Sequence, residues 1–261
     1  MERLGLIAGN GQFPFVVARS AKGKGYSVAA CAIRGETDPA LEKEVEALTW
    51  VELWELEKLL HFFKTQGVQK ALMAGQVKKE RLFKEAPLRL RLPSRIADRA
   101  LLGMVVKSLK GIGVRLLDST YFLSSDLVKK GCLSKRTPTR EEWKDVAFGR
   151  KVARRTAFFE VGQTVVVKQG VVLAIEALEG TDQAIRRGGA LGREGVVVVK
   201  MARPRQDMRF DVPVIGPRTI EALREVRAST LAVQAGKTLL IEKERLRVEA
   251  DAVGLALVGI R

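Results

Sequence analysis

Short apolar runs alternate with segments of helical periodicity along the first half of the chain. Four runs of strand length lie at 4–8, 26–33, 71–75 and 114–117. Between them, apolar residues recur at helical spacing over 15–22, 51–65 and 96–110. Strands that alternate with helices are typical of βαβ units, which build a parallel sheet. The pattern therefore predicts an N-terminal Rossmann-like domain with a parallel sheet.

The second half has a different pattern, in which two β-branched runs follow each other closely. These runs, at 163–168 and 171–176, are joined by Gln169-Gly170, which predicts a hairpin. Further strands are predicted at 195–200, 231–234, 238–241 and 255–260. Helices are predicted through Ile185, at 219–227 and at 243–253. A hairpin combined with strands separated by helices predicts a second α/β domain with a mixed sheet.

A predicted helix start marks the transition between the two patterns. Thr139 is followed three residues later by Glu142, which is the spacing of a capping box. We place the domain boundary shortly before this helix, near residue 134. The predicted domains are therefore 1–133 and 134–261.

The chain carries a large excess of positive charge. Its 46 Lys and Arg residues against 30 Asp and Glu give a net charge of +16 over 261 residues. This charge indicates an anionic partner: nucleic acid, a phosphorylated substrate or an anionic membrane surface. No run approaches the ~18 apolar residues of a membrane span, and the N-terminus lacks a signal-peptide pattern. Two distant cysteines and one histidine argue against disulfide, zinc and His-triad chemistry, and they fit a cytoplasmic protein.

The turn Gly9-Asn10-Gly11-Gln12 connects the first predicted strand to the first helix. Glycines in such a turn let the backbone approach a ligand, and the helix N-terminus offers N–H groups to a phosphate. Pro14 takes the place of the third glycine of a dinucleotide fingerprint, but it suits the first turn of a helix. The turn is either a nucleotide-binding loop or a tight connection without a ligand.

Acidic residues gather at strand ends and in loops of the second half. Glu179 and Asp182 flank a predicted helix start, and Asp207 and Asp211 flank Arg209. Carboxylates near basic groups can hold Mg²⁺ together with a phosphate. Solvated loops with ion pairs, or an N-cap role for Asp182, explain the same residues without a metal.

A basic segment at 78–95 interleaves Lys and Arg with Leu and Phe. A basic face with an apolar side can lie on an anionic membrane or bind nucleic-acid phosphates. An ordinary charged surface explains it equally well.

Several segments together resemble the LpxI-type UDP-2,3-diacylglucosamine pyrophosphatases of lipid A biosynthesis. The specific segments are E-G-T-D at 179–182 and R-F-D-V-P-V-I-G at 209–216. They are accompanied by the glycine turn, by D-R-A-L-L at 98–102 and by A-D-A-V-G-L at 250–255. The resemblance implies a cytoplasmic enzyme with its active site between two domains. Domain 1–133 would bind the nucleotide, and domain 134–261 would provide catalysis and lipid binding.

The resemblance also implies the reaction. Water would attack the α-phosphorus of UDP-2,3-diacylglucosamine with the help of Mg²⁺, giving UMP and 2,3-diacylglucosamine 1-phosphate (lipid X). By motif, Asp211 matches the family's essential aspartate, and Lys200 and Arg209 would offset charge on the phosphates. The metal would be held by carboxylates among Glu179, Asp182, Asp207 and Asp211. Substrate contacts are expected from Gly9, Asn10, Gly11, Gln12, Pro14, Gly75 and Thr181.

The expected partners are an acylated UDP-sugar and, weakly, an anionic membrane surface that the segment 78–95 would face. We expect no nucleic acid, and a homodimer is a further prediction. Two other interpretations stay open. A non-catalytic nucleic-acid-binding protein rests on the +16 charge alone, with only 6% aromatic residues for base stacking. A nucleotide-sugar hydrolase of different specificity would use the same fold.

Overall fold

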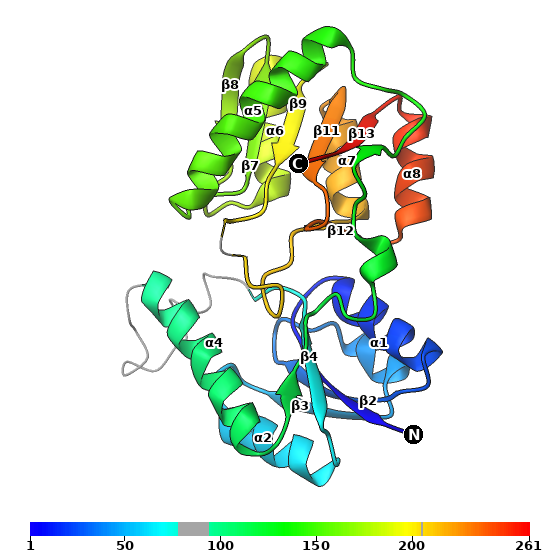
Figure 1. Ribbon diagram of the computed structural model, residues 1–261, viewed down its shortest axis with the longest axis vertical. Helices are drawn as coiled ribbons and strands as arrows, with labels where there is room; N and C mark the ends of the chain where they lie inside the picture. The colour runs from blue at the N-terminus through cyan, green and yellow to red at the C-terminus, as the bar shows by residue number, and fades with distance from the viewer. Residues whose placement is uncertain (78–93, 205) are drawn as a thin grey trace. The chain divides into compact units, whose positions relative to one another are not determined.

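The computed structural model of the chain describes residues 1–77, 94–204 and 206–261. The predicted basic segment at 78–95 lies outside these residues, apart from the backbone of the first two residues of a helix. The described residues form two units, each with its own core (Figure 1). The first comprises 1–123 and 208–210, and the second 124–207 and 211–261. The predicted boundary near 134 lies later in the chain than this division.

The first unit contains a parallel sheet of five strands, as the alternating pattern predicts (Figure 1). The strands are β1 (Arg3–Ala8), β2 (Ser27–Ile33), β3 (Ala47–Val51), β4 (Lys70–Ala74) and β5 (Arg115–Leu116). Their order is β3-β2-β1-β4-β5, and every neighbouring pair is parallel. The order therefore changes direction between β1 and β4, which is where open α/β sheets bind ligands.

The helices of this unit follow the predicted periodicity with one correction. They are α1 (Phe13–Gly23), α2 (Leu56–Thr65), α4 (Ser94–Gly111) and the short 3₁₀ helix η1 (Pro39–Glu44). The helix predicted at 51–65 begins only at Leu56, because Val51 ends strand β3. This strand is at the edge of the sheet and is mostly half-buried, so it lacks the continuous apolar run that identifies β1 and β2.

The second unit contains the predicted mixed sheet. Its strands are β6 (Gly131–Cys132), β7 (Thr164–Lys168), β8 (Val171–Ile175), β9 (Val197–Lys200), β11 (Thr230–Gln234) and β13 (Ala256–Ile260). In the order β6-β13-β11-β9-β7-β8, the three middle strands β13, β11 and β9 are parallel. The hairpin β7–β8 and strand β6 are antiparallel to their neighbours. The predicted strand at 238–241 is instead in a separate pair, β10 (Val214–Ile215) with β12 (Leu239–Leu240).

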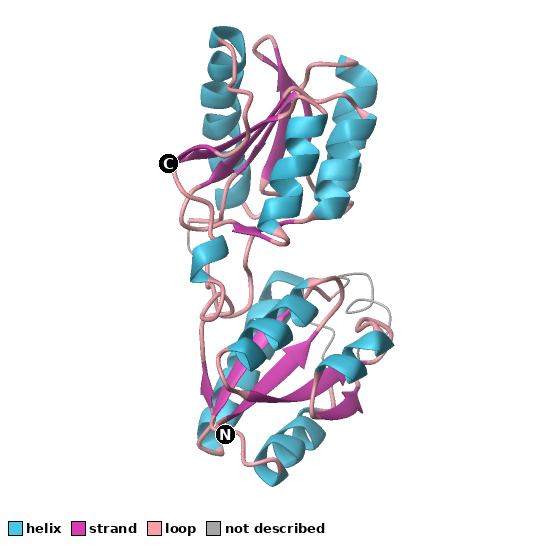
Figure 2. Ribbon diagram, turned by 90° about the vertical axis from the view of Figure 1, so that its right-hand side faces the viewer, coloured by secondary structure: helices cyan, strands magenta, loops and turns pink. Residues whose placement is uncertain are grey.

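Helices cover both faces of this mixed sheet (Figure 2). Helix α5 (Arg140–Phe158) packs on the face that carries Val197 and Val199. The opposite face, which carries Val198, is covered by α6 (Thr181–Gly192), α7 (Pro217–Glu225) and α8 (Lys243–Ala252). Burial on both faces explains why β9 reads as an uninterrupted valine run in the sequence. Within the described residues, no helix is both long enough and apolar enough to cross a membrane.

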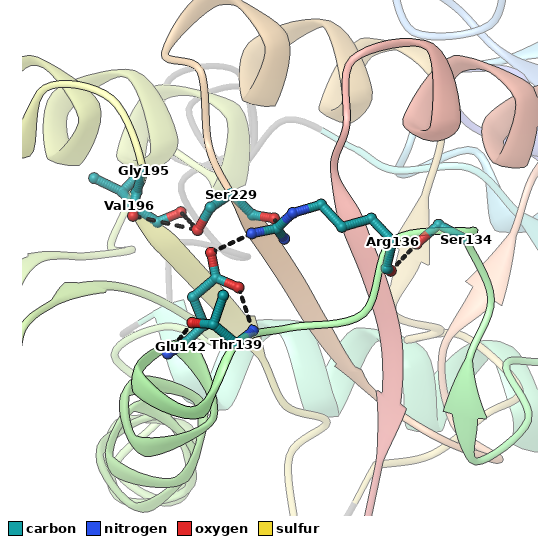
Figure 3. Close-up of polar contacts among 7 residues, drawn as sticks. All are labelled: Ser134, Arg136, Thr139, Glu142, Gly195, Val196 and Ser229. Carbon is teal, nitrogen blue, oxygen red and sulfur yellow. Dashed lines mark hydrogen bonds and ion pairs between the residues drawn. The ribbon is translucent and has the colours of Figure 1, made fainter.

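The predicted capping box at the start of α5 is present and is part of a larger polar network (Figure 3). Thr139 Oγ1 accepts from the Glu142 amide at 3.2 Å, and Glu142 Oε2 accepts from the Thr139 amide at 2.8 Å. Arg136 donates to Glu142 Oε1 at 2.6 Å and to the carbonyl of Ser229 at 2.8 Å. The network thus joins the first turn of α5 to the residue that precedes β11.

The charge of Glu142 is stabilised inside this network. Its side chain is only 14% exposed. Burial alone would raise the pKa of this carboxyl, but hydrogen bonds from Arg136, Thr139 and Ser229 outweigh burial and lower the pKa below its ordinary value of 4.5.

The lowered pKa gives the network a defined pH dependence. A carboxyl with a depressed folded-state pKa contributes stability that is present above pH 4.5 and is lost as pH falls through the folded-state pKa. We expect Glu142→Gln to lower the free energy of unfolding by about 1–2 kcal/mol at pH 7, because the amide keeps the cap but loses the ion pair. Urea unfolding should show the difference shrinking below pH 4.5.

Glu141→Gln is the matched control, since Glu141 is exposed in the same first turn. It should change stability by less than about 0.5 kcal/mol. A difference for Glu142→Gln that persists unchanged at acid pH would contradict the assignment of the effect to charge.

Candidate active site

The predicted glycine turn follows β1 and is held in place by the loop that follows β4. The Gly9 amide donates to the carbonyl of Ala74 at 2.8 Å, and the Asn10 amide donates to the carbonyl of Gln76 at 2.8 Å. A Cβ atom on Gly9 would lie 2.5 Å from the Gln76 carbonyl oxygen. The two loops therefore touch through their backbones at the point where the strand order changes direction.

Gly75 is required by two separate features of this contact. Its φ of +91° favours glycine, and an added Cβ would lie 2.6 Å from the carbonyl oxygen of Asn10. Backbone atoms cannot move aside as a flexible side chain would, so a larger residue would separate the two loops. The structure thus brings Gly75 together with Gly9 and Asn10, and their role in substrate binding stays a prediction.

The remaining residues of the turn lead directly into α1. Gly11 has a φ of +86°, and Gln12 is the N-cap residue without a side-chain capping bond. Pro14 occupies the first turn, as predicted. The first N–H groups of α1 are therefore available at the end of the turn. Asn10 Nδ2 donates to Glu36 at 2.9 Å, so its side chain is turned toward the loop after β2.

In the second unit, Lys200 is a buried cation at the end of β9. The residue is 8% exposed, and its Nζ donates to Thr181 Oγ1 at 2.9 Å. The Thr181 hydroxyl donates in turn to Glu176 Oε1 at 3.0 Å. Lys200 has no ion-pair partner among the residues that the structure describes. A buried ammonium group without a carboxylate partner is costly, and an anionic ligand would offset that cost.

Thr181 belongs to a helix start that adds to the positive potential at this position. Gly180 is the N-cap of α6, with a φ of +83° and no side-chain capping bond. The first amides of the helix therefore have no helical acceptor, and the helix dipole places partial positive charge there. Lys200 and the α6 N-terminus thus meet at one edge of the sheet.

Asp182 and Glu179 lie beside this helix start, and each has a basic partner. Asp182 Oδ1 accepts from Thr219 Oγ1 at 3.1 Å, and Oδ2 is 3.9 Å from Arg218 Nε. Glu179 forms a 2.6 Å ion pair with Arg187. Burial raises the pKa of Glu179, but the hydrogen bond from Arg187 and backbone N–H groups outweigh it and lower that pKa. Glu179 therefore carries its negative charge at neutral pH.

Asp211 lies in a compact loop with Arg203 and Gln206. Its Oδ2 is 3.0 Å from Arg203 Nη1, its amide donates to the carbonyl of Asp207 at 3.0 Å, and its carbonyl accepts from Gln206 Nε2. The side chain of Asp211 is 40% exposed. Its second oxygen, Oδ1, accepts no hydrogen bond within the described part of the chain. One carboxylate oxygen thus remains for a ligand, while the other is held by Arg203.

Arg209 belongs to the first unit although its neighbours Asp207 and Asp211 belong to the second. Ser119 donates through its amide to the carbonyl of Met208 at 2.9 Å and through Oγ to the carbonyl of Arg209 at 2.7 Å. The guanidinium of Arg209 lies 5.3 Å from the centre of the Phe210 ring. The side chain is thus held beside the neighbouring aromatic ring.

The four predicted metal ligands do not form a ready cage. Among the described residues, no three His, Cys, Asp or Glu side chains are grouped so that they could hold a metal ion. Mg²⁺ is usually bound by one or two carboxylates together with water and substrate phosphates. Asp211, with its available Oδ1, fits that kind of site, whereas Glu179 and Asp182 are occupied by basic groups and a hydroxyl. Magnesium dependence stays a prediction.

Three residues outside the predicted set complete these contacts. Glu176 accepts from Thr181, Arg203 holds Asp211, and Glu36 accepts from Asn10. Glu176 could have been predicted from the sequence, because it ends a β-branched strand just before the E-G-T-D segment. Arg203 begins a longer segment, 203–216, that also resembles the family, but its contact with Asp211 could not be predicted, and Glu36 gave no signal in the sequence.

Comparisons with known proteins identify the family. The model of the LpxI N-terminal domain matches residues 3–125, and that of the LpxI C-terminal domain matches 129–258. A protein of Caulobacter vibrioides, described as UDP-2,3-diacylglucosamine pyrophosphatase LpxI, is 31% identical over 277 residues. That alignment covers 100% of this chain and 98% of the relative.

Solved structures are only distantly similar. A CobK precorrin-6A reductase aligns with a TM-score of 0.37 and 14% identity, covering 100% of this chain and 88% of that one. A leucoanthocyanidin reductase–NADPH complex from Vitis vinifera aligns with a TM-score of 0.29 and 18% identity, covering 54% of this chain and 41% of that one. These TM-scores are too low to support any argument. The two domain models and the full-length relative place the chain in the LpxI family.

Proposed function

We propose that the protein hydrolyses the pyrophosphate of UDP-2,3-diacylglucosamine with Mg²⁺, releasing UMP and 2,3-diacylglucosamine 1-phosphate. Water would attack the α-phosphorus. The observation that carries the proposal is Lys200, buried without an ion-pair partner among the described residues beside the N-terminus of α6. The activity that names the Caulobacter relative supplies the substrate.

The first unit would bind the uridine nucleotide at the loops after β1 and β4. Open parallel sheets bind nucleotides where the strand order changes direction, and Gly9, Asn10 and Gly75 meet at that point. Gly11, Gln12 and Pro14 lead into the α1 N-terminus, whose amides suit a phosphate.

The second unit would stabilise the negative charge that develops on the pyrophosphate. Lys200 and the first amides of α6 are fixed before substrate arrives, so little reorganisation is needed during reaction. Thr181 holds the Lys200 ammonium and is itself held by Glu176. Arg209 would provide additional positive charge.

Magnesium would act together with Asp211. The ion would be bound through the available Oδ1 of Asp211 and oxygens of the pyrophosphate, with Asp207 as the next candidate. Bound Mg²⁺ supplies charge neutralisation and lowers the pKa of water. Arg203 would keep Asp211 in position, because it holds the other carboxylate oxygen.

A substrate with two acyl chains resides in a membrane, so we also propose that the protein works at an anionic membrane surface on the cytoplasmic side. The net charge of +16 supports such a location. A homodimer remains a prediction.

The proposal is tested by incubating the full-length protein with UDP-2,3-diacylglucosamine dispersed in detergent and measuring UMP release. We expect hydrolysis that requires Mg²⁺, stops with chelator and returns with added metal. UDP-glucosamine without acyl chains should react at least about tenfold more slowly. Absence of UMP release, or full activity after chelation, would contradict the proposal.

Asp211→Asn is the informative variant for the metal role. It should lower kcat by about 100-fold or more, since the amide is a weaker metal ligand. Asp126→Asn, a change of the same kind at a half-buried position of the second unit, should be close to normal. Equal activity of the two variants would refute the role of Asp211.

Lys200→Met should separate function from stability. We expect kcat/KM to fall by about 10²-fold, equivalent to about 3 kcal/mol of transition-state stabilisation. The free energy of unfolding should stay level or rise by about 1 kcal/mol, because a buried charge is removed while Thr181 still donates to Glu176. Urea unfolding and steady-state kinetics measure both effects. Marked destabilisation would instead indicate a structural role for the ammonium group.

Gly75→Ala tests the contact between the two loops of the first unit. The added Cβ would meet backbone atoms of Gly9 and Asn10, so we expect KM for the UDP-sugar to rise about tenfold. Gly113→Ala is the matched control, since its φ is +80° but its Cβ would meet open space. Both variants should lose about 1 kcal/mol of stability from backbone strain. If both variants raised KM equally, the effect of Gly75→Ala could not be assigned to the contact between the two loops.

A further inference from the structure

The outward face of α5 combines basic and aromatic side chains over its last two turns. The helix packs on the sheet through Gly149 and Ala153, and Ala157 on the same side is buried. Lys151, Arg154 and Arg155 are exposed. The two aromatic residues that follow, Phe158 and Phe159, are 66% and 60% exposed. We call these five exposed residues, Lys151, Arg154, Arg155, Phe158 and Phe159, the α5 surface.

The cations of the α5 surface lie close together along one helix and are not balanced by ion pairs with described residues. Lys151, Arg154 and Arg155 make no ion pair within the part of the chain that the structure describes. The arginines of α8 differ, since Arg245 and Arg247 are paired with glutamates on the same helix. The α5 surface therefore presents a local positive field rather than a balanced one.

Phe158 and Phe159 are exposed in spite of being large apolar groups. Their rings pack on each other edge to face, with centroids 5.4 Å apart. Val161, two residues further, is also exposed. Adjacent exposed rings next to unpaired cations are typical of surfaces that insert into the boundary between lipid headgroups and acyl chains.

The chain connects this surface to the end of the sheet that carries Lys200. After α5, Gly162 and Gln163 lead into β7, and the first residue of β7, Thr164, is paired with Lys200 at the end of β9 (Figure 1). The C-terminal end of α5, with its two aromatic residues, and the buried Lys200 thus lie toward the same end of strands β7 and β9.

We propose that the α5 surface docks on the anionic headgroup layer of a phospholipid bilayer. The cations would attract acidic phospholipids, and the two rings would enter the interface. The inference rests on the proposed function in that the substrate is a membrane lipid. Docking of the α5 surface would bring the edge with Lys200 close to the layer that holds that substrate. Single-stranded RNA would also engage the cations and could stack on the rings, so RNA binding is one outcome of the test.

The experiment measures cosedimentation of the full-length protein with vesicles that contain no substrate. Vesicles of phosphatidylglycerol and phosphatidylcholine should bind the protein, and vesicles of phosphatidylcholine alone should bind it much less. The triple variant Lys151→Gln, Arg154→Gln, Arg155→Gln should lose roughly 100-fold in partition coefficient, from about fivefold per cation. Phe158→Ala with Phe159→Ala should lose about tenfold or more.

The matched control removes equal charge from other exposed lysines of the second unit, with Lys129→Gln, Lys130→Gln and Lys237→Gln. It should bind vesicles within about threefold of the unchanged protein. Equal losses in the two triple variants, no loss on removing the rings, or tighter binding to single-stranded RNA than to vesicles would overturn the inference. UMP release from detergent-dispersed substrate, measured for every variant, shows separately whether the proposed function holds.

Discussion

The hydrogen bond from Lys200 to Thr181 is the interaction on which the proposed chemistry of the second unit depends. It joins the end of β9 to the start of α6, and Thr181 extends the link to Glu176 at the end of β8. The arrangement is unfavourable by itself, because a buried ammonium group faces the positive end of a helix dipole and, among the described residues, its partner is a neutral hydroxyl. Such a site gains stability when a pyrophosphate arrives. The buried charge of Lys200 destabilises the free protein, and the same charge would bind an anion strongly.

The first unit uses a different constraint, which is the close approach of two backbones. Hydrogen bonds between the loops after β1 and β4 require that Gly9 and Gly75 have no side chain. Packing of this kind fixes the turn through its backbone, and Glu36 adds a hydrogen bond with the Asn10 side chain. The first unit thus offers a rigid backbone surface, and the second unit by itself offers a preformed electrostatic site for an anion.

Local patterns predicted the fold well, and tertiary contacts explain what they missed. The βαβ alternation, the hairpin and the Thr139–Glu142 capping box all depend on neighbours in sequence, and the structure contains them. Strand β3 was not predicted, because this edge strand is mostly half-buried and lacks a long apolar run.

The candidate site was predicted less completely for the same reason. Motif position made Lys200, Thr181 and Asp211 candidates, but their partners come from other loops and strands. The sequence singled out Asp211 by motif and named Glu179, Asp182 and Asp207 as further candidate ligands, but it did not show that an arginine pairs with Glu179 and another holds one oxygen of Asp211. Only the placement of those arginines distinguishes the carboxylates, and spacing along the chain does not encode it.

The basic residues that give the chain its net charge of +16 act in three different ways. On α8, Arg245 and Arg247 are paired with glutamates and contribute little field. The cations of the α5 surface are exposed and unpaired among the described residues, so they act at long range, although salt screens them beyond about 8 Å. Lys200 is buried and therefore escapes most of that screening, but it acts only on a ligand in contact with it. Added salt should therefore weaken the binding of the α5 surface to an anionic membrane. It should weaken the interaction of Lys200 with a bound pyrophosphate far less.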